Sequence, residues 1–66
     1  MTNNAERKWR IGAVLEKVPE KEINKEKFMA LMMIEWGFSR RTILEYVNAL
    51  VAADHVREGN DNIWRK

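Results

Sequence analysis

The sequence contains no cysteine and a single histidine, His55. Without cysteine, the chain has no disulfide framework and no cysteine zinc site, and one histidine alone cannot build a metal cluster. The chain also has neither a nucleophile-elbow motif nor a phosphate-binding glycine loop. Glu20, Glu22 and Glu26 belong to a charged connector rather than to an acid pair in a pocket. In a chain of 66 residues, which has little room for a pocket, we expect no enzyme activity, cofactor, metal or small-molecule substrate.

Long hydrophobic runs are missing too. The longest purely apolar run, residues 28–34, is far shorter than the ~20 residues that a membrane-spanning helix needs. The first ten residues, MTNNAERKWR, are polar and lack the apolar core of a signal peptide. We therefore expect no membrane partner, and we expect a soluble protein of the cytoplasm.

The composition indicates one small folded domain, residues 1–66. Hydrophobic residues make up 45% of the sequence and charged residues 33%, which is typical of a globular chain rather than a disordered one. Twelve basic residues face ten acidic ones, for a net charge of +2. So small an excess permits a nucleic-acid partner without requiring one, because binding depends on where the charges lie.

The first predicted helix covers residues 5–17. Its apolar residues recur at i, i+3, i+4 and i+7, the spacing of one helix face: Ile11, Val14, Leu15 and Val18. Pro19 ends it, because the residue before a proline is pushed out of the helical region. Gly12 weakens a helix by roughly 1 kcal/mol relative to alanine, which suggests a point of close helix packing.

Two further helices are predicted, over residues 25–36 and 40–53. Asn24 is suited to cap the first of them, and Gly37 to end it in the left-handed conformation. Ser39 caps the next helix. The three residues between these helices force them to cross steeply, as in a helix-turn-helix. The last helix carries one inward stripe: Ile43, Leu44, Val47, Leu50 and Val51.

The C-terminal residues 55–66 predict a β-hairpin. The stretch EGNDN gathers glycine, asparagine and aspartate, the residues that adopt positive φ at a hairpin tip. Between the first two helices, a polar connector holds one apolar residue, Ile23, and forms a short extended link. The chain is thus predicted to be mainly α-helical, with three helices and a C-terminal β-hairpin.

This order resembles the winged helix-turn-helix superfamily of DNA-binding domains, in a compact form similar to small regulators of archaea and their viruses. The resemblance is carried by Ser39, Arg40, Thr42, Ile43, Leu50 and the exit Asp54-His55-Val56. It implies that residues 40–53 are a recognition helix and that the hairpin is the wing. The departure is Asp54, where the superfamily usually has glycine. Aspartate tolerates the left-handed conformation better than most residues, so the turn is expected to survive with some strain.

As a member of this superfamily, the protein would bind double-stranded DNA, and we expect a transcriptional regulator. Helical spacing puts Arg41 opposite the apolar stripe, as a base reader that could hold guanine through two hydrogen bonds. Ser39 is also counted among the DNA-binding residues, Arg40 lies where it can reach a phosphate, and Thr42 and Tyr46 can donate to phosphates. Glu45 could accept from cytosine or could simply repel DNA of other sequences. The wing offers Arg57, Asn60, Asn62 and Arg65 to the backbone or the minor groove, and the first helix offers Arg7, Lys8 and Arg10 to phosphates.

Other interpretations stay open. Two arginines after a serine cap often form no more than a solvated helix start, and Leu44 occupies a position where resembling families often have another arginine. The large rings of Trp36 and Trp64 are expected to close the core rather than to stack on bases.

The helix at residues 25–36 is apolar nearly all round, which predicts burial nearly all round. Either the wing and Trp9 cover its outer side, or a homodimer interface is built on Met29, Met33 and Trp36. This apolar face also supports the alternative function, a winged-helix module that binds protein within a larger assembly.

Overall fold

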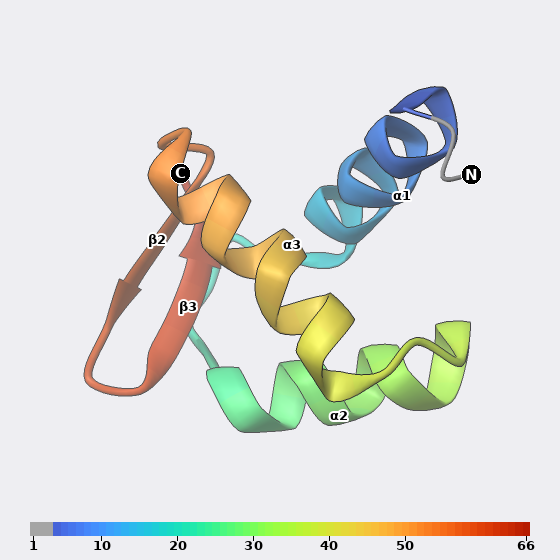
Figure 1. Cartoon of the computed structure of the whole chain (residues 1–66). Helices are drawn as coiled ribbons and strands as arrows, with labels where there is room; N and C mark the ends of the chain where they lie inside the picture. The colour runs from blue at the N-terminus through green and yellow to red at the C-terminus, as the bar shows by residue number, and fades with distance from the viewer. Residues whose placement is uncertain (1–3) are drawn as a thin grey trace.

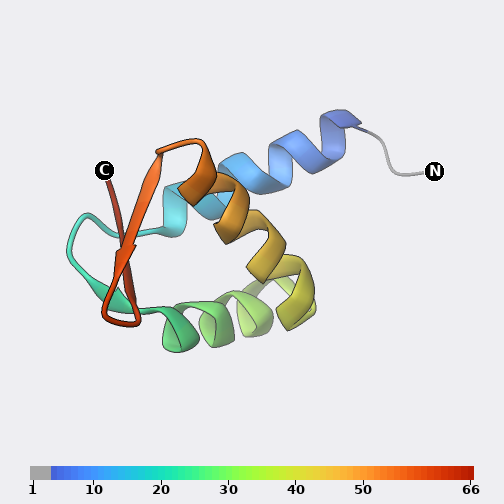
Figure 2. The same cartoon turned by 60° about the vertical axis from the view of Figure 1, so that its left-hand side comes forward.

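The structure of the protein is a computed structural model that describes residues 4–66. Three helices come first: α1 (Asn4–Lys17), α2 (Lys25–Trp36) and α3 (Arg40–Ala52). The strands are β1 (Ile23–Asn24), β2 (Val56–Gly59) and β3 (Asn62–Arg65). α3 lies between the other two helices and contacts both of them, while the hairpin of β2 and β3 lies at the end opposite to the N-terminal part of α1 (Figures 1 and 2). The chain is therefore mainly helical with a small C-terminal antiparallel strand pair, as expected, and this layout is compatible with a winged helix.

Both ends of α2 and the start of α3 have the predicted caps. The Asn24 side chain accepts a hydrogen bond from the Lys27 backbone N–H at 3.0 Å, and Ser39 Oγ accepts one from the Thr42 N–H at 3.2 Å. Gly37 ends α2 at φ 72° and donates its N–H to the Met33 carbonyl. Its positive φ is the conformation for which glycine is preferred. α3 ends one residue before the predicted bound, because Ala53 is its C-cap.

The turn into the hairpin is also the expected one. Asp54 has φ 66°, so this aspartate adopts the left-handed conformation that was expected for it. At the tip, Asn60 and Asp61 have φ 52° and 65°, as the type I′ turn of a two-residue hairpin loop requires.

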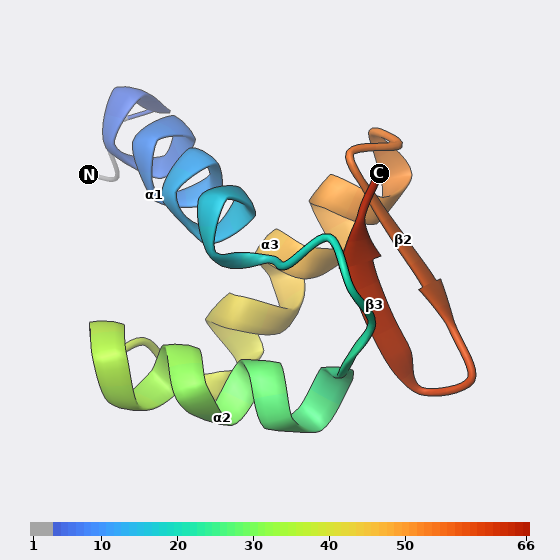
Figure 3. The same ribbon diagram turned by 180° about the vertical axis from the view of Figure 1, so that it is seen from behind.

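β1 turns the hairpin into a three-stranded antiparallel sheet with strand order β1-β3-β2. Ile23 pairs with Ile63 and Asn24 with Asn62. Figure 3 shows the link from α1 running beside β3 into α2. The extended link was predicted, but its pairing with β3 was not. The sheet ties the connector to the C-terminus, since Arg65 also donates its backbone N–H to the Pro19 carbonyl at 2.8 Å.

One core joins all three helices and the hairpin. Ile63 and Val56 of the hairpin close it from the sheet side. Trp64, expected in the core, is half-buried and packs against Gly59, where a Cβ would lie 3.5 Å from its ring. The buried side chains are Val14, Val18, Phe28, Met29, Met32, Ile43, Tyr46, Val47, Leu50, Val56 and Ile63.

No helix in the described residues is long and apolar enough to cross a membrane.

Candidate nucleic-acid interface

The exposed face of α3 begins with Arg41, whose side chain is 90% exposed. Glu45 and Asn48, at i+4 and i+7 from Arg41, are exposed on the same side of the helix. Arg41 therefore lies on the surface that was predicted for it. Asn48 was not among the predicted DNA-binding residues, although its spacing from Arg41 could have placed it on the same helix face. An asparagine there can pair with adenine through two hydrogen bonds.

α1 adds a second arginine to this face. Arg7 Nη2 lies 3.9 Å from Glu45 Oε2, and Arg41 Nε lies 4.0 Å from Glu45 Oε1. One carboxylate thus stands between two guanidinium groups from different helices. The three side chains together carry one net positive charge on an exposed surface. Arg10, further along α1, pairs instead with Glu6 and lies over the Phe38 ring at 5.1 Å.

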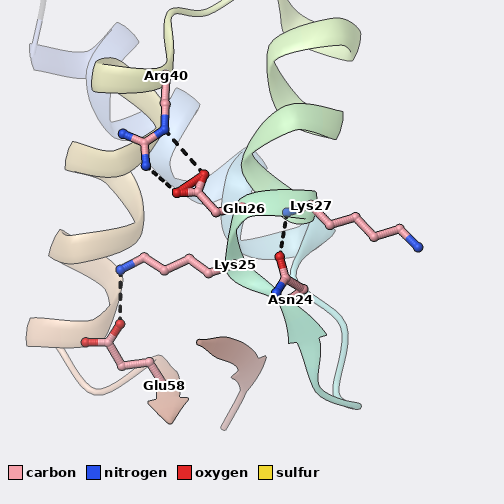
Figure 4. A network of polar contacts seen from close by, with 6 residues as sticks. All are labelled: Asn24, Lys25, Glu26, Lys27, Arg40 and Glu58. Carbon is pink, nitrogen blue, oxygen red and sulfur yellow. Dashed lines mark hydrogen bonds and ion pairs between the residues drawn. The ribbon is translucent and has the colours of Figure 1, made fainter. Parts of the chain in front are cut away.

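Arg40 faces the start of α2. It pairs with Glu26, and its Nε donates to Glu26 Oε2 at 3.3 Å (Figure 4). This hydrogen bond is the main cause that raises the pKa of Arg40 and lowers the pKa of the Glu26 carboxyl. Arg40 would have to leave Glu26, or share it, in order to hold a DNA phosphate.

A shallow groove of about 570 Å³ lies beside this pair, between the start of α2, α3 and the hairpin tip. Lys25 lines it and donates to Glu58 of β2 at 3.2 Å (Figure 4), while its backbone N–H donates to the Asp61 carbonyl. Both cations of the groove are therefore held by carboxylates. The half-buried Leu44 lines the groove as well.

The ring of Tyr46, a predicted DNA contact, lies in the core. Its side chain is 4% exposed, and its ring meets the Phe38 ring edge-on, with centroids 6.0 Å apart. Phe38 belongs to a row of aromatic contacts that continues through Trp36 to Trp9. The buried side of α3 thus includes Tyr46 next to three residues of the predicted stripe, Ile43, Val47 and Leu50. Thr42 stays half-exposed, and its hydroxyl lies 3.0 Å from Ser39 Oγ.

The residues predicted for the wing divide into two groups. Arg57 and Asn60 are exposed and have no ion pair or side-chain hydrogen bond within residues 4–66. Asn62 donates to Glu22 at 3.2 Å, and Arg65 lies 3.5 Å from Glu20. Glu22 and Glu20 both come from the connector before β1. Acidic groups of the connector thus hold two of the four predicted wing residues, Asn62 and Arg65.

The predicted dimer interface needs a second correction. Met29 is 1% exposed and belongs to the core, so it cannot contact a second chain. Met33 is 37% exposed and Trp36 is half-buried. The outer side of α2 instead carries Leu31 and Ile34, which are 45% and 82% exposed. The hairpin and Trp9, which were expected to cover this side, leave Ile34 mostly exposed.

In comparisons with protein-family models, curated proteins and solved structures, no match to this chain was found. Within residues 4–66 there is also no cluster of three or more histidine, cysteine or acidic side chains that could hold a metal ion.

Proposed function

We propose that this protein is a winged helix-turn-helix protein that binds double-stranded DNA and acts as a transcriptional regulator. α3 enters the major groove, and its first turns lie nearest the bases. Arg41 reads a base, with Asn48 further along the same face. α1 and the hairpin hold the DNA backbone on either side.

The observation that carries this proposal is the surface of Arg41, Glu45 and Arg7. Arg41 is almost fully exposed near the N-terminus of α3, on the helix that follows a three-residue turn. A cation at this end of a helix opposes the positive pole of the helix dipole. An approaching anion offsets that cost, and the backbone N–H groups of the same turn favour phosphate as well. Arg7, brought alongside through Glu45, supplies a phosphate contact from a second helix.

Selection of bound duplexes from a random pool, followed by a salt titration on the selected duplex, tests the proposal. We expect a log–log slope of roughly −4 to −6 per monomer, if about five or six phosphates are neutralised. Lys21→Ala is the matched control for Arg7→Ala, because it removes one exposed positive charge from the connector. Arg7→Ala should weaken binding to every sequence, while Lys21→Ala should change it little. No salt-sensitive binding to any duplex would contradict the proposal.

The alternative is a module that binds another protein through the outer side of α2. Its support is the exposure of two large apolar side chains on this side of the helix, Ile34 at 82% and Leu31 at 45%. Ile34→Asp separates the two functions. It should abolish binding to a protein partner, and it should leave DNA binding unchanged, because α3 and α1 carry the proposed DNA contacts.

A further inference from the structure

The side of α1 that faces away from the core forms one wall of an open, largely apolar groove of about 580 Å³. Trp9 is the prominent residue on this side, with 63% of its surface exposed. Trp36 of α2 forms the opposite wall, and its ring centroid lies 5.7 Å from that of Trp9. The α1 residues of the groove recur at helical spacing: Ala5, Lys8, Trp9, Gly12, Ala13, Glu16 and Lys17.

Gly12 lies on this face, and no contact within the described chain accounts for a glycine at this position. Glycine weakens a helix interior relative to alanine, and the sequence suggested close packing at this point. The structure shows the opposite within the chain, because a Cβ added to Gly12 would meet no atom within 4 Å. A glycine open to solvent in mid-helix leaves the backbone bare for the close approach of another element.

Charges stand on both sides of Gly12 at equal spacing. Lys8 precedes it by four residues and Glu16 follows it by four, so the two charges flank it along α1. Neither has an ion pair or side-chain hydrogen bond within residues 4–66. When two copies of α1 cross antiparallel at Gly12, Lys8 of each copy faces Glu16 of the other. A parallel crossing would instead bring like charges together.

We propose that a second copy of this chain occupies the groove and forms a twofold dimer, in which the α1 helices cross antiparallel at Gly12. Trp9 of each copy covers the small residues Gly12 and Ala13 of the other, and two Lys8–Glu16 pairs fix the register. The interface is isologous, as a twofold axis requires. It differs from the one predicted on Met29, Met33 and Trp36. It does not depend on DNA binding, although a twofold dimer of a DNA-binding protein would read a site of matching symmetry.

Sedimentation equilibrium of charge variants tests this arrangement. Lys8→Glu alone sets the introduced carboxylate against Glu16 of the other copy, and Glu16→Lys alone sets the introduced ammonium group against Lys8. Each variant should therefore dissociate at concentrations where the parent chain is dimeric. An equimolar mixture should dimerise again, because one copy then carries two acids and the other two lysines at the crossing. This rescue by mixing requires contact between copies and would not follow from a structural role within one chain.

Two further variants locate the interface. Gly12→Leu should keep the fold, since the site is open, and should abolish the dimer by holding the helices apart; circular dichroism checks the fold. Ile34→Asp should leave the dimer intact. A parent chain that stays monomeric at high micromolar concentration would overturn the proposal. So would charge variants that dimerise like the parent, a mixture that stays monomeric, or a dimer lost with Ile34→Asp and kept with Lys8→Glu.

Discussion

Replacing Arg41 by alanine probes the proposed base reader with little disturbance of the fold. The Arg41 side chain is 90% exposed, and its one ion pair within the described residues, to Glu45, spans 4.0 Å. Substitutions at such exposed positions usually change stability by no more than about 0.5 kcal/mol. Glu45 also keeps its contact with Arg7 after the substitution. A change in DNA affinity would therefore report on the contact with DNA and not on unfolding.

The expected loss follows from the contact proposed for Arg41. Two hydrogen bonds to a guanine contribute about 1–3 kcal/mol of discrimination against another base, which corresponds to roughly 5- to 150-fold in Kd. Only the duplex that carries the correct base should show this loss. A contact to phosphate would weaken all duplexes alike and reduce the salt slope by about 1.

Fluorescence anisotropy distinguishes these outcomes. Parent and Arg41→Ala proteins are titrated against the selected duplex and against duplexes with single base changes, at two salt concentrations. Lys21→Ala, which removes one exposed charge from the connector, is the control for net charge. An equal loss on every duplex would refute the assignment of Arg41 as a base reader, and an unchanged affinity would remove α3 from the DNA interface.

Burial and charge lead to three further predictions. Tyr46→Phe should leave DNA affinity unchanged in the same anisotropy assay, because the Tyr46 side chain is 4% exposed; a clear loss would return its hydroxyl to the interface. Met29→Ala should lower the free energy of unfolding by about 2–5 kcal/mol in urea titrations, because Met29 is buried. Ile34→Ala, at an 82% exposed position, should lower it by less than about 0.5 kcal/mol. Equal losses of stability would contradict the corrected orientation of α2. Arg40 lowers the pKa of Glu26, and Lys66 lowers the pKa of Asp54. Each carboxylate therefore stabilises the fold at pH values above the ordinary carboxyl pKa of about 4. This stabilisation is lost as the pH falls through the lowered pKa values. The difference in Tm between the parent and Glu26→Gln should therefore shrink from pH 7 to pH 3 in circular dichroism melts, and a constant difference would contradict this linkage.

The parts of the fold that depend on local chemistry could be predicted from the sequence. Gly37 and Ser39 set the boundaries of α2 and α3 through backbone conformation and capping, which involve only neighbouring residues. The left-handed turn at Asp54 could likewise be predicted from a short stretch of sequence, through its resemblance to a known motif. Such features need no knowledge of what packs against them.

The features that the sequence did not predict are contacts between distant segments. Ile23 pairs with Ile63 across forty residues, and the polar connector gave no sign of its partner strand. Met29 and Tyr46 were placed by the geometry of one helix alone, yet the side of a helix that becomes buried depends on its neighbours. Tyr46 is buried and meets the ring of Phe38 edge-on. Met29 is buried against the rest of the core, while Ile34 turns to solvent.

Because of the ion pairs, the salt dependence of DNA binding shows better than the net charge how many cations contact phosphates. Most basic residues near the proposed DNA surface already hold a carboxylate: Arg40 holds Glu26, and Arg65 holds Glu20. If these pairs persist on DNA, four of the predicted contacts stay available to neutralise phosphates within residues 4–66: Arg7, Lys8, Arg41 and Arg57. At about 0.9 per phosphate they give a slope near −4. The steeper part of the expected range, toward −6, thus requires carboxylates to be exchanged for phosphates. Glu26→Gln removes the carboxylate that holds Arg40 in the free protein. If Arg40 already contacts a phosphate in the parent complex, the substitution should strengthen DNA binding and leave the salt slope unchanged. If Arg40 stays paired with Glu26 in the parent complex, the substitution should steepen the salt slope by about 1.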